Sequence, residues 1–264
     1  MKTLLRILAL ATILSTRADD LKAGAAWADI TPKLGTPMAG YYSERGAEGT
    51  HDPLKAKAIV IETGGTKTAL VALDLISTLR TTVEEARRMI ERETGIPGKN
   101  VMISATHSHT GPIFSGGRRF DTLGGNHPLA QEYTYGLPVL IARAVKEADA
   151  RLTACKLSYG AGVEENLAFN RRFHMRDGSV GWNPGKLNPE IIRPAGPTDP
   201  RVHVVYFQTE KDQPLATYAN FAMHLDTVGG THYSADYPFT LSESLSRAKG
   251  PDMLTVFTIG CAGY

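Results

Sequence analysis

The strongest constraint on the fold is a series of short β-branched and apolar runs that mix irregularly with helical patterns. Residues 55–62 and 67–75 are two such runs, and the Thr-Gly-Gly-Thr between them predicts a β-hairpin. Comparable runs predict further strands at residues 25–32, 100–104, 156–160, 202–207, 216–223 and 253–259.

Three segments have the 3.6-residue periodicity of helices. These are residues 81–93, which Gly95 terminates, residues 129–150, in which Pro138 predicts a kink or a restart, and residues 237–247. Strands and helices follow one another without a regular β-α-β alternation. We therefore expect an α/β (mixed α+β) fold of layered sheets flanked by helices, not a regular barrel.

One long segment has neither pattern. Residues 162–201 are polar and rich in Gly, Pro and Asn, which predicts an extended loop. Loops of this length within a compact domain are usually functional or disordered.

The first residues have the pattern of a secretory signal peptide. Residues 1–18 combine a basic start, an apolar stretch and a small residue at a possible cleavage site. The apolar stretch is shorter than the roughly 20 residues that a membrane span needs. We expect residues 1–18 to be removed and the protein to be secreted or periplasmic; the alternative is a buried or frayed N-terminal helix.

Charge and hydropathy narrow the choice of partners. Removal of residues 1–18 takes away three basic residues and leaves 26 basic against 27 acidic ones. Basic stripes with interleaved aromatic residues are not evident, so nucleic acid is not an expected partner. A second long apolar run is also lacking, so we expect no transmembrane segment.

The two cysteines, Cys155 and Cys261, lie far apart in the sequence. They lack the C-x-x-C spacing of a zinc site, and we expect both to be small buried residues. Whether they pair stays open, because a disulfide requires Cα atoms closer than about 7 Å.

Two histidines follow the apolar run that precedes residue 104. Residues 106–112 read Thr-His-Ser-His-Thr-Gly-Pro. In a strand, residues i and i+2 share a face, so His107 and His109 would project together and begin a zinc site. The alternative is a pair of hydrogen-bonded structural histidines.

A third histidine lies in a similar setting. His224 ends the apolar run 216–223 and is followed by Asp226, an acidic group that could support a metal ligand. A core histidine bound to a backbone carbonyl is the alternative. Two such sites in one chain favour a metal centre in which zinc activates water and polarises a carbonyl.

Other polar residues have more than one interpretation. Asp74 ends a strand, where an acid serves a ligand or caps a helix. Arg171, next to Arg172 in the long loop, could bind an anionic or carbonyl oxygen through its forked guanidinium, or could be a solvated loop charge. Ser234 and Asp236 follow His224 closely, but the G-x-S-x-G context of a nucleophile elbow is lacking.

Taken in order, these motifs resemble the neutral/alkaline (non-lysosomal) ceramidase family over nearly all of the chain after residue 18. The matching segments are residues 28–32, 38–41, 51–54, 71–74, 103–112, 170–171 and 199–200, and the strand that leads to His224.

The resemblance implies a zinc-dependent amidohydrolase of sphingolipid metabolism that cleaves an N-acyl amide such as ceramide. His107 and His224 match two of the family's Zn²⁺ ligands. His109 matches the histidine beside the reacting carbonyl, and Arg171 matches the arginine that helps to bind it. The expected partner is a small-molecule or lipid amide substrate, and the oligomeric state is open.

The resemblance also implies that residues 19–264 form an incomplete N-terminal catalytic domain whose C-terminal part is missing. The family's other zinc ligands, a Glu and a Tyr, and its nucleophilic Ser would lie beyond Tyr264, which stands where an Asp is usual. We therefore expect this stretch alone to be inactive.

Two other functions fit the histidines. One is a different secreted metal-dependent hydrolase that carries H-x-H on a (β/α)8 barrel, although the irregular strand order counts against it. The other is a non-catalytic binding module or pseudoenzyme, since two histidines alone hold zinc poorly.

Overall fold

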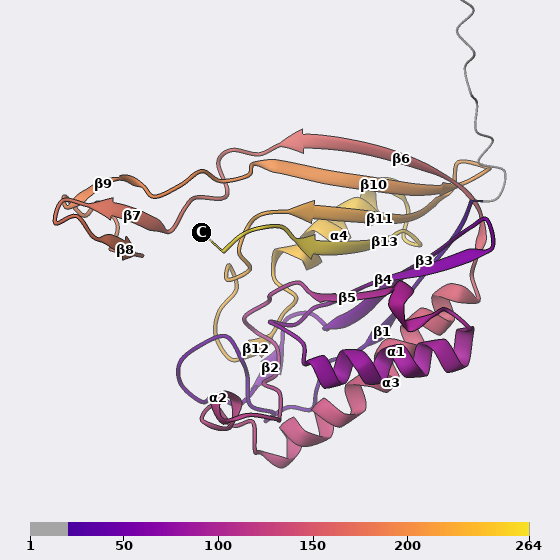
Figure 1. Ribbon diagram of the computed structural model, residues 1–264, viewed down its shortest axis with the longest axis horizontal. Helices are drawn as coiled ribbons and strands as arrows, with labels where there is room; N and C mark the ends of the chain where they lie inside the picture. Colours follow the sequence, from indigo (N-terminus) through magenta and orange to yellow (C-terminus); the bar gives the residue numbers. More distant parts are fainter. Residues whose placement is uncertain (1–20, 264) are drawn as a thin grey trace, which may run out of the picture.

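A mixed β-sheet is the framework of the molecule (Figure 1), which is a computed structural model that describes residues 21–263. The predicted signal peptide, residues 1–18, lies outside the described residues. Within them, eight strands form one sheet in the order β13-β11-β10-β6-β1-β3-β4-β5. Their bounds are Lys22–Asp29 (β1), Lys55–Thr63 (β3), Thr66–Leu73 (β4), Val101–Ala105 (β5), Thr153–Val163 (β6), Arg201–Thr209 (β10), Pro214–Phe221 (β11) and Leu254–Ile259 (β13).

Strand directions confirm the mixed, layered fold class. Only the pairs β4–β5 and β11–β13 are parallel, and the other neighbours in this sheet of the described chain are antiparallel. A (β/α)8 barrel requires eight parallel strands, so that alternative is wrong. The predicted hairpin is β3–β4, and its turn residues Gly64 and Gly65 both have positive φ, as a tight two-residue hairpin requires.

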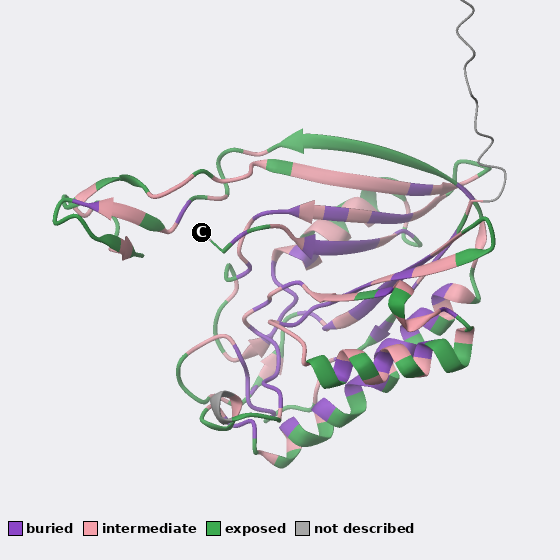
Figure 2. Ribbon diagram, in the orientation of Figure 1, coloured by how far each residue is buried: buried purple, intermediate pink, exposed green. Residues whose placement is uncertain are grey.

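One pair of helices lies against the half of the sheet that contains β1 and β3, and one further helix lies against the half that contains β13. Helices α1 (Arg80–Thr94) and α3 (Pro128–Asp149) pack on each other, and α3 packs on β1 and β3. Helix α4 (Tyr237–Lys249) packs on β13. A short helix, α2 (Arg118–Asp121), and a 3-10 turn (Gly98–Asn100) complete the helical elements of the described residues. Figure 2 shows the buried residues concentrated between the α1–α3 layer and the sheet.

Helix α3 contains Pro138 in its interior. The helix continues through Pro138, so the predicted restart is not observed, and the predicted kink stays a prediction. Proline removes one intrahelical hydrogen bond, but Leu137, Ile141, Ala144 and Val145 form a buried face against the core, and this burial outweighs that loss.

The predicted loop 162–201 is wrong in its middle part. It contains a three-stranded antiparallel sheet made of β7 (Arg172–Met175), β8 (Val180–Trp182) and β9 (Ile191–Pro194). We call residues 171–194 the arm, because they project beyond the ends of β6 and β10 (Figure 1). Its strands are three or four residues long and mostly exposed, so they lack the apolar alternation by which strands are predicted.

The cysteines differ from each other. Cys155 is buried as expected, whereas Cys261 is exposed, so the expectation of two buried cysteines is wrong. Cys261 follows the end of β13, where the chain leaves the core. Both thiols are free. Among the helices of residues 21–263, none combines the length and apolarity needed to cross a bilayer.

Candidate metal centre

His107 and His109 lie in the loop that follows β5, not in the strand itself. β5 ends at Ala105, and His107 has a φ of 77°, which no extended strand contains. The predicted reason for their proximity, a shared strand face, is therefore wrong. The loop is held instead by backbone hydrogen bonds from Thr106 to Leu73 and from His107 to Leu75. It nevertheless brings the two Nε2 atoms to 3.3 Å from each other.

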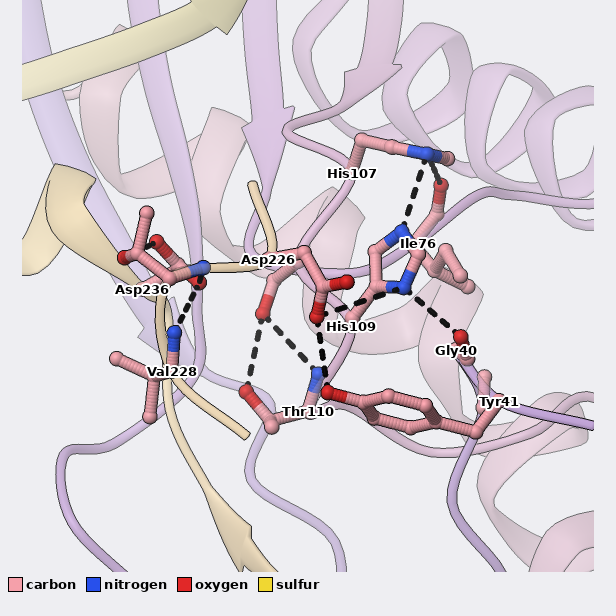
Figure 3. A network of polar contacts seen from close by, with 12 residues as sticks. Gly40, Tyr41, Ile76, His107, His109, Thr110, Asp226, Val228 and Asp236 are labelled. Carbon is pink, nitrogen blue, oxygen red and sulfur yellow. Dashed lines mark hydrogen bonds and ion pairs between the residues drawn. The ribbon is translucent and has the colours of Figure 1, made fainter. Parts of the chain in front are cut away.

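Backbone carbonyls fix the orientation of both rings. Nδ1 of His107 is 2.8 Å from the carbonyl oxygen of Ile76, and Nδ1 of His109 is 2.8 Å from that of Gly40 (Figure 3). Because a carbonyl only accepts hydrogen bonds, each Nδ1 carries the proton, and each neutral ring has its lone pair on Nε2. Two lone pairs facing each other at 3.3 Å repel unless a proton or a cation lies between them.

His224 completes the cluster from a different part of the chain. It lies three residues after the end of β11, and its ring centroid is 4.9 Å from that of His107 and 4.7 Å from that of His109. One nitrogen from each ring lies within 4.8 Å of the others. Three imidazoles with two opposed lone pairs fit Zn²⁺ or a similar divalent cation. The structure brings all three histidines together, whereas the resemblance implies that only His107 and His224 are ligands.

The electrostatics favour the neutral form of His109 and His224. Burial, followed by the positive charge of Arg171, lowers the pKa of His224 to about 4. Burial also lowers the pKa of His109, and the nearby Asp226 carboxylate opposes this shift. Both rings are therefore neutral at pH 7, which is the form that binds a metal ion.

An open pocket of about 270 Å³ lies beside His224. Arg171 and Asp226 line it as well. Arg171 thus lines the same pocket as His224, and its guanidinium carbon lies 6.0 Å from the centre of the Trp182 ring.

Three further polar residues lie near His109, and the sequence indicated only one of them, Asp226. The Tyr41 hydroxyl donates to Asp226 at 2.9 Å, and Asp226 is 3.9 Å from Nδ1 of His109 (Figure 3). Arg45 donates a hydrogen bond from Nη2 to the carbonyl oxygen of His109 at 2.7 Å. Its guanidinium carbon lies over the Tyr41 ring, 4.1 Å from the ring centre. Asp226 had a sequence signal, its position two residues after His224, but it lies against His109. Arg45 had none, because its contact crosses 64 residues of sequence.

Asp74 is not part of the cluster. It forms a buried ion pair with Lys57 at 3.0 Å and accepts a hydrogen bond from the Lys55 backbone. Neither the predicted ligand role nor the helix cap is therefore observed for it.

Comparisons with known proteins show what the chain is similar to. No protein-family model matches the chain. A curated neutral ceramidase from Pseudomonas aeruginosa is 30% identical over 233 residues, which cover 84% of this chain and 33% of the relative. The crystal structure of neutral ceramidase from Pseudomonas aeruginosa has a TM-score of 0.75 at 25% identity and covers 92% of this chain and 39% of that one. A ceramidase complexed with C2 has a TM-score of 0.74 at 24% identity and covers 91% of this chain and 37% of its own length.

The curated match and the structural match point to the same group of proteins, and the chain spans about a third of the length of that curated relative. On this evidence, the chain belongs to the neutral ceramidase family and corresponds to part of its members' length.

Proposed function

We propose that this chain carries the histidine centre of a zinc-dependent amidohydrolase that cleaves an N-acyl amide of the ceramide type into a fatty acid and an amine. The observation that carries the proposal is the His107–His109–His224 cluster, whose ligand atoms lie within 4.8 Å of one another and in which the pKa values of His109 and His224 are lowered. The neutral ceramidase relative supports the amide substrate. In this proposal residues 19–264 form the N-terminal part of a catalytic domain, preceded by an export signal in residues 1–18.

The histidines take different roles. His107 and His224 hold the cation, and His109 lies beside the substrate carbonyl. Zinc in such a site supplies Lewis acidity towards an amide carbonyl and a water molecule of lowered pKa. The carbonyls of Ile76 and Gly40 keep the two rings in the tautomer that presents Nε2 to the centre.

The pocket beside His224 suits both the polar carbonyl group and the apolar acyl chain of an N-acyl amide. Arg171 offers a forked cation for the carbonyl or carboxylate oxygen. Leu167, Phe169 and Met223 line the same pocket and offer apolar contacts to the acyl chain.

Metal analysis tests the ligand assignment. The purified chain is expected to bind about one zinc ion, and His107→Ala and His224→Ala are each expected to lose it. His174→Ala is the matched control, because His174 lies in β7 of the arm, outside the cluster. Zinc content equal to wild type in both His107→Ala and His224→Ala would refute the assignment.

Hydrolysis tests the activity. The assay uses the longest native polypeptide that contains residues 21–263. We expect this protein to release fatty acid from ceramide, and we expect the variants His109→Ala and Arg171→Ala to lose this activity. Full zinc binding without turnover on a panel of N-acyl amides would favour a binding module instead.

A further inference from the structure

Residues 234–237, at the start of α4, contact both loops that carry the histidines. We call residues 106–112 the first histidine loop and residues 222–228 the second. The carbonyl oxygen of Ser234 accepts hydrogen bonds from the hydroxyls of Ser108, at 2.7 Å, and Thr110, at 2.9 Å. Ser108 and Thr110 are fully buried and flank His109 on both sides. A single carbonyl therefore fixes the backbone around His109.

The second histidine loop is held at both of its ends. The Tyr237 hydroxyl donates to the carbonyl of Met223 at 2.9 Å. The carboxylate of Asp236 accepts from the backbone amides of Thr227, at 2.9 Å, and Val228, at 3.0 Å. His224 lies between these attachment points, so residues 236 and 237 set the path of the backbone that carries it.

A buried acid anchors this segment from a third part of the chain. One carboxylate oxygen of Asp52 accepts from the Ser234 hydroxyl at 2.6 Å, and the other accepts from the Ala235 amide at 2.7 Å. Asp52 is only 7% exposed. Asp236 has a φ of 62°, a strained conformation that persists in a protein only when its surroundings enforce it.

Helix capping alone does not account for these contacts. Asp236 does cap α4, through the amide of Tyr237 at 2.7 Å. A cap, however, needs neither the Tyr237 hydroxyl on Met223 nor two hydroxyls on the carbonyl of Ser234. Both of these additional contacts lead to the histidine loops.

We propose that residues 234–237, anchored by Asp52, are positioning residues that hold the two histidine loops together. They act on the site through the two loops that carry the histidines. That these residues hold the loops together follows from the contacts above, whereas the expected effect on zinc affinity rests on the proposed function.

Tyr237→Phe tests the contact with the second histidine loop. The substitution removes one hydroxyl and keeps the ring, which packs edge-on against Phe257 at 5.3 Å. We expect the zinc dissociation constant to rise about tenfold or more, as for loss of other groups that orient metal ligands. In the metal-free chain, amide hydrogen exchange in residues 222–228 is expected to accelerate.

Tyr233→Phe is the matched control. Its hydroxyl also donates to a backbone carbonyl, that of Lys33 at 3.2 Å, which belongs to neither histidine loop. We expect Tyr233→Phe to lower the stability of the chain while keeping the wild-type zinc affinity and the wild-type exchange in residues 222–228. An equal loss of zinc affinity in both variants would show a general loss of stability and overturn the positioning role.

Asp52→Asn tests the anchor. The amide oxygen can accept from Ala235 while the Ser234 hydroxyl turns to accept from the amide N–H group, but both hydrogen bonds then lose their charged acceptor and are weaker. We expect weaker zinc binding and faster exchange in residues 106–112, although Asp52 bonds residues 234 and 235 and not the loop itself. Wild-type exchange in both histidine loops of folded Tyr237→Phe and Asp52→Asn would overturn the proposal. If the wild-type chain binds no zinc, the metal centre fails, and the exchange rates alone decide on the positioning role.

Discussion

Position 40 requires glycine, because its backbone has a positive φ and lies too close to the first histidine loop for a side chain. Its carbonyl fixes the His109 ring, and its φ of 104° lies in the region that favours glycine. A Cβ atom at this position would lie 2.4 Å from the carbonyl oxygen of His109. The backbone of residue 40 must therefore approach the first histidine loop without a side chain.

We expect Gly40→Ala to lower the free energy of unfolding by more than Gly64→Ala does. Gly64 also has positive φ but has open space around it, so alanine there costs only the conformational strain of about 1–2 kcal/mol. At residue 40 the contact with His109 adds to that strain. Urea unfolding of the two variants measures the difference, and equal losses would contradict the close approach.

At the residue scale, the sequence predicts which histidines meet but not how they meet. His107, His109 and His224 follow strands, and the structure does bring them together. Their geometry depends on the positive φ of His107 and on a carbonyl 69 residues away in sequence, that of Gly40. Neither the backbone conformation of His107 nor the contact with Gly40 leaves a pattern in the neighbouring sequence. The contacts of Arg45 and of residues 234–237 are equally invisible, because they exist only after the chain has folded.

Among the elements, β3 and β4 are tied at one end by the buried ion pair of Lys57 and Asp74. The Asp74 carboxylate is fully buried, and this burial raises its pKa, an effect that the adjacent Lys57 ammonium opposes. Buried pairs of this kind contribute little net stability, but removal of one partner leaves a charge without compensation.

We expect Asp74→Ala to lower the free energy of unfolding by about 3–5 kcal/mol. The double variant Lys57→Met with Asp74→Leu is expected to recover most of this loss, because it replaces the pair by apolar groups. Chemical denaturation of the single and double variants forms the test. A double variant as unstable as Asp74→Ala would mean that the ion pair itself stabilises the sheet.

Elements with a buried face are predictable here, and elements without one are not. The hairpin β3–β4 and helix α1 follow from periodicity because one or both faces enter the core. Strand β6 extends from Thr153 to Val163, well beyond the predicted residues 156–160, and it is almost wholly exposed (Figure 2). The strands of the arm are similar. Their pairing depends on neighbouring strands, which a local sequence pattern does not record.

For the molecule as a whole, cation binding at a centre built from two distant loops should stabilise the fold. Zinc at about 100 times its dissociation constant is expected to add about 2.7 kcal/mol to the free energy of unfolding, provided that it binds only the folded state. The expected result is a higher melting temperature with zinc, reversed by a chelator. His224→Ala should show no zinc response, and a shift equal to wild type in that variant would contradict the centre.

The arm also provides the chain with an optical probe. The sequence has two tryptophans, Trp27 in β1 and Trp182 in β8, which are 45% and 57% exposed. Trp182 lies near Arg171, a residue of the pocket, whereas Trp27 lies against Lys55. Replacing Trp27 by phenylalanine would leave Trp182 as the single tryptophan, so that tryptophan fluorescence of the unlabelled chain would report what enters the pocket.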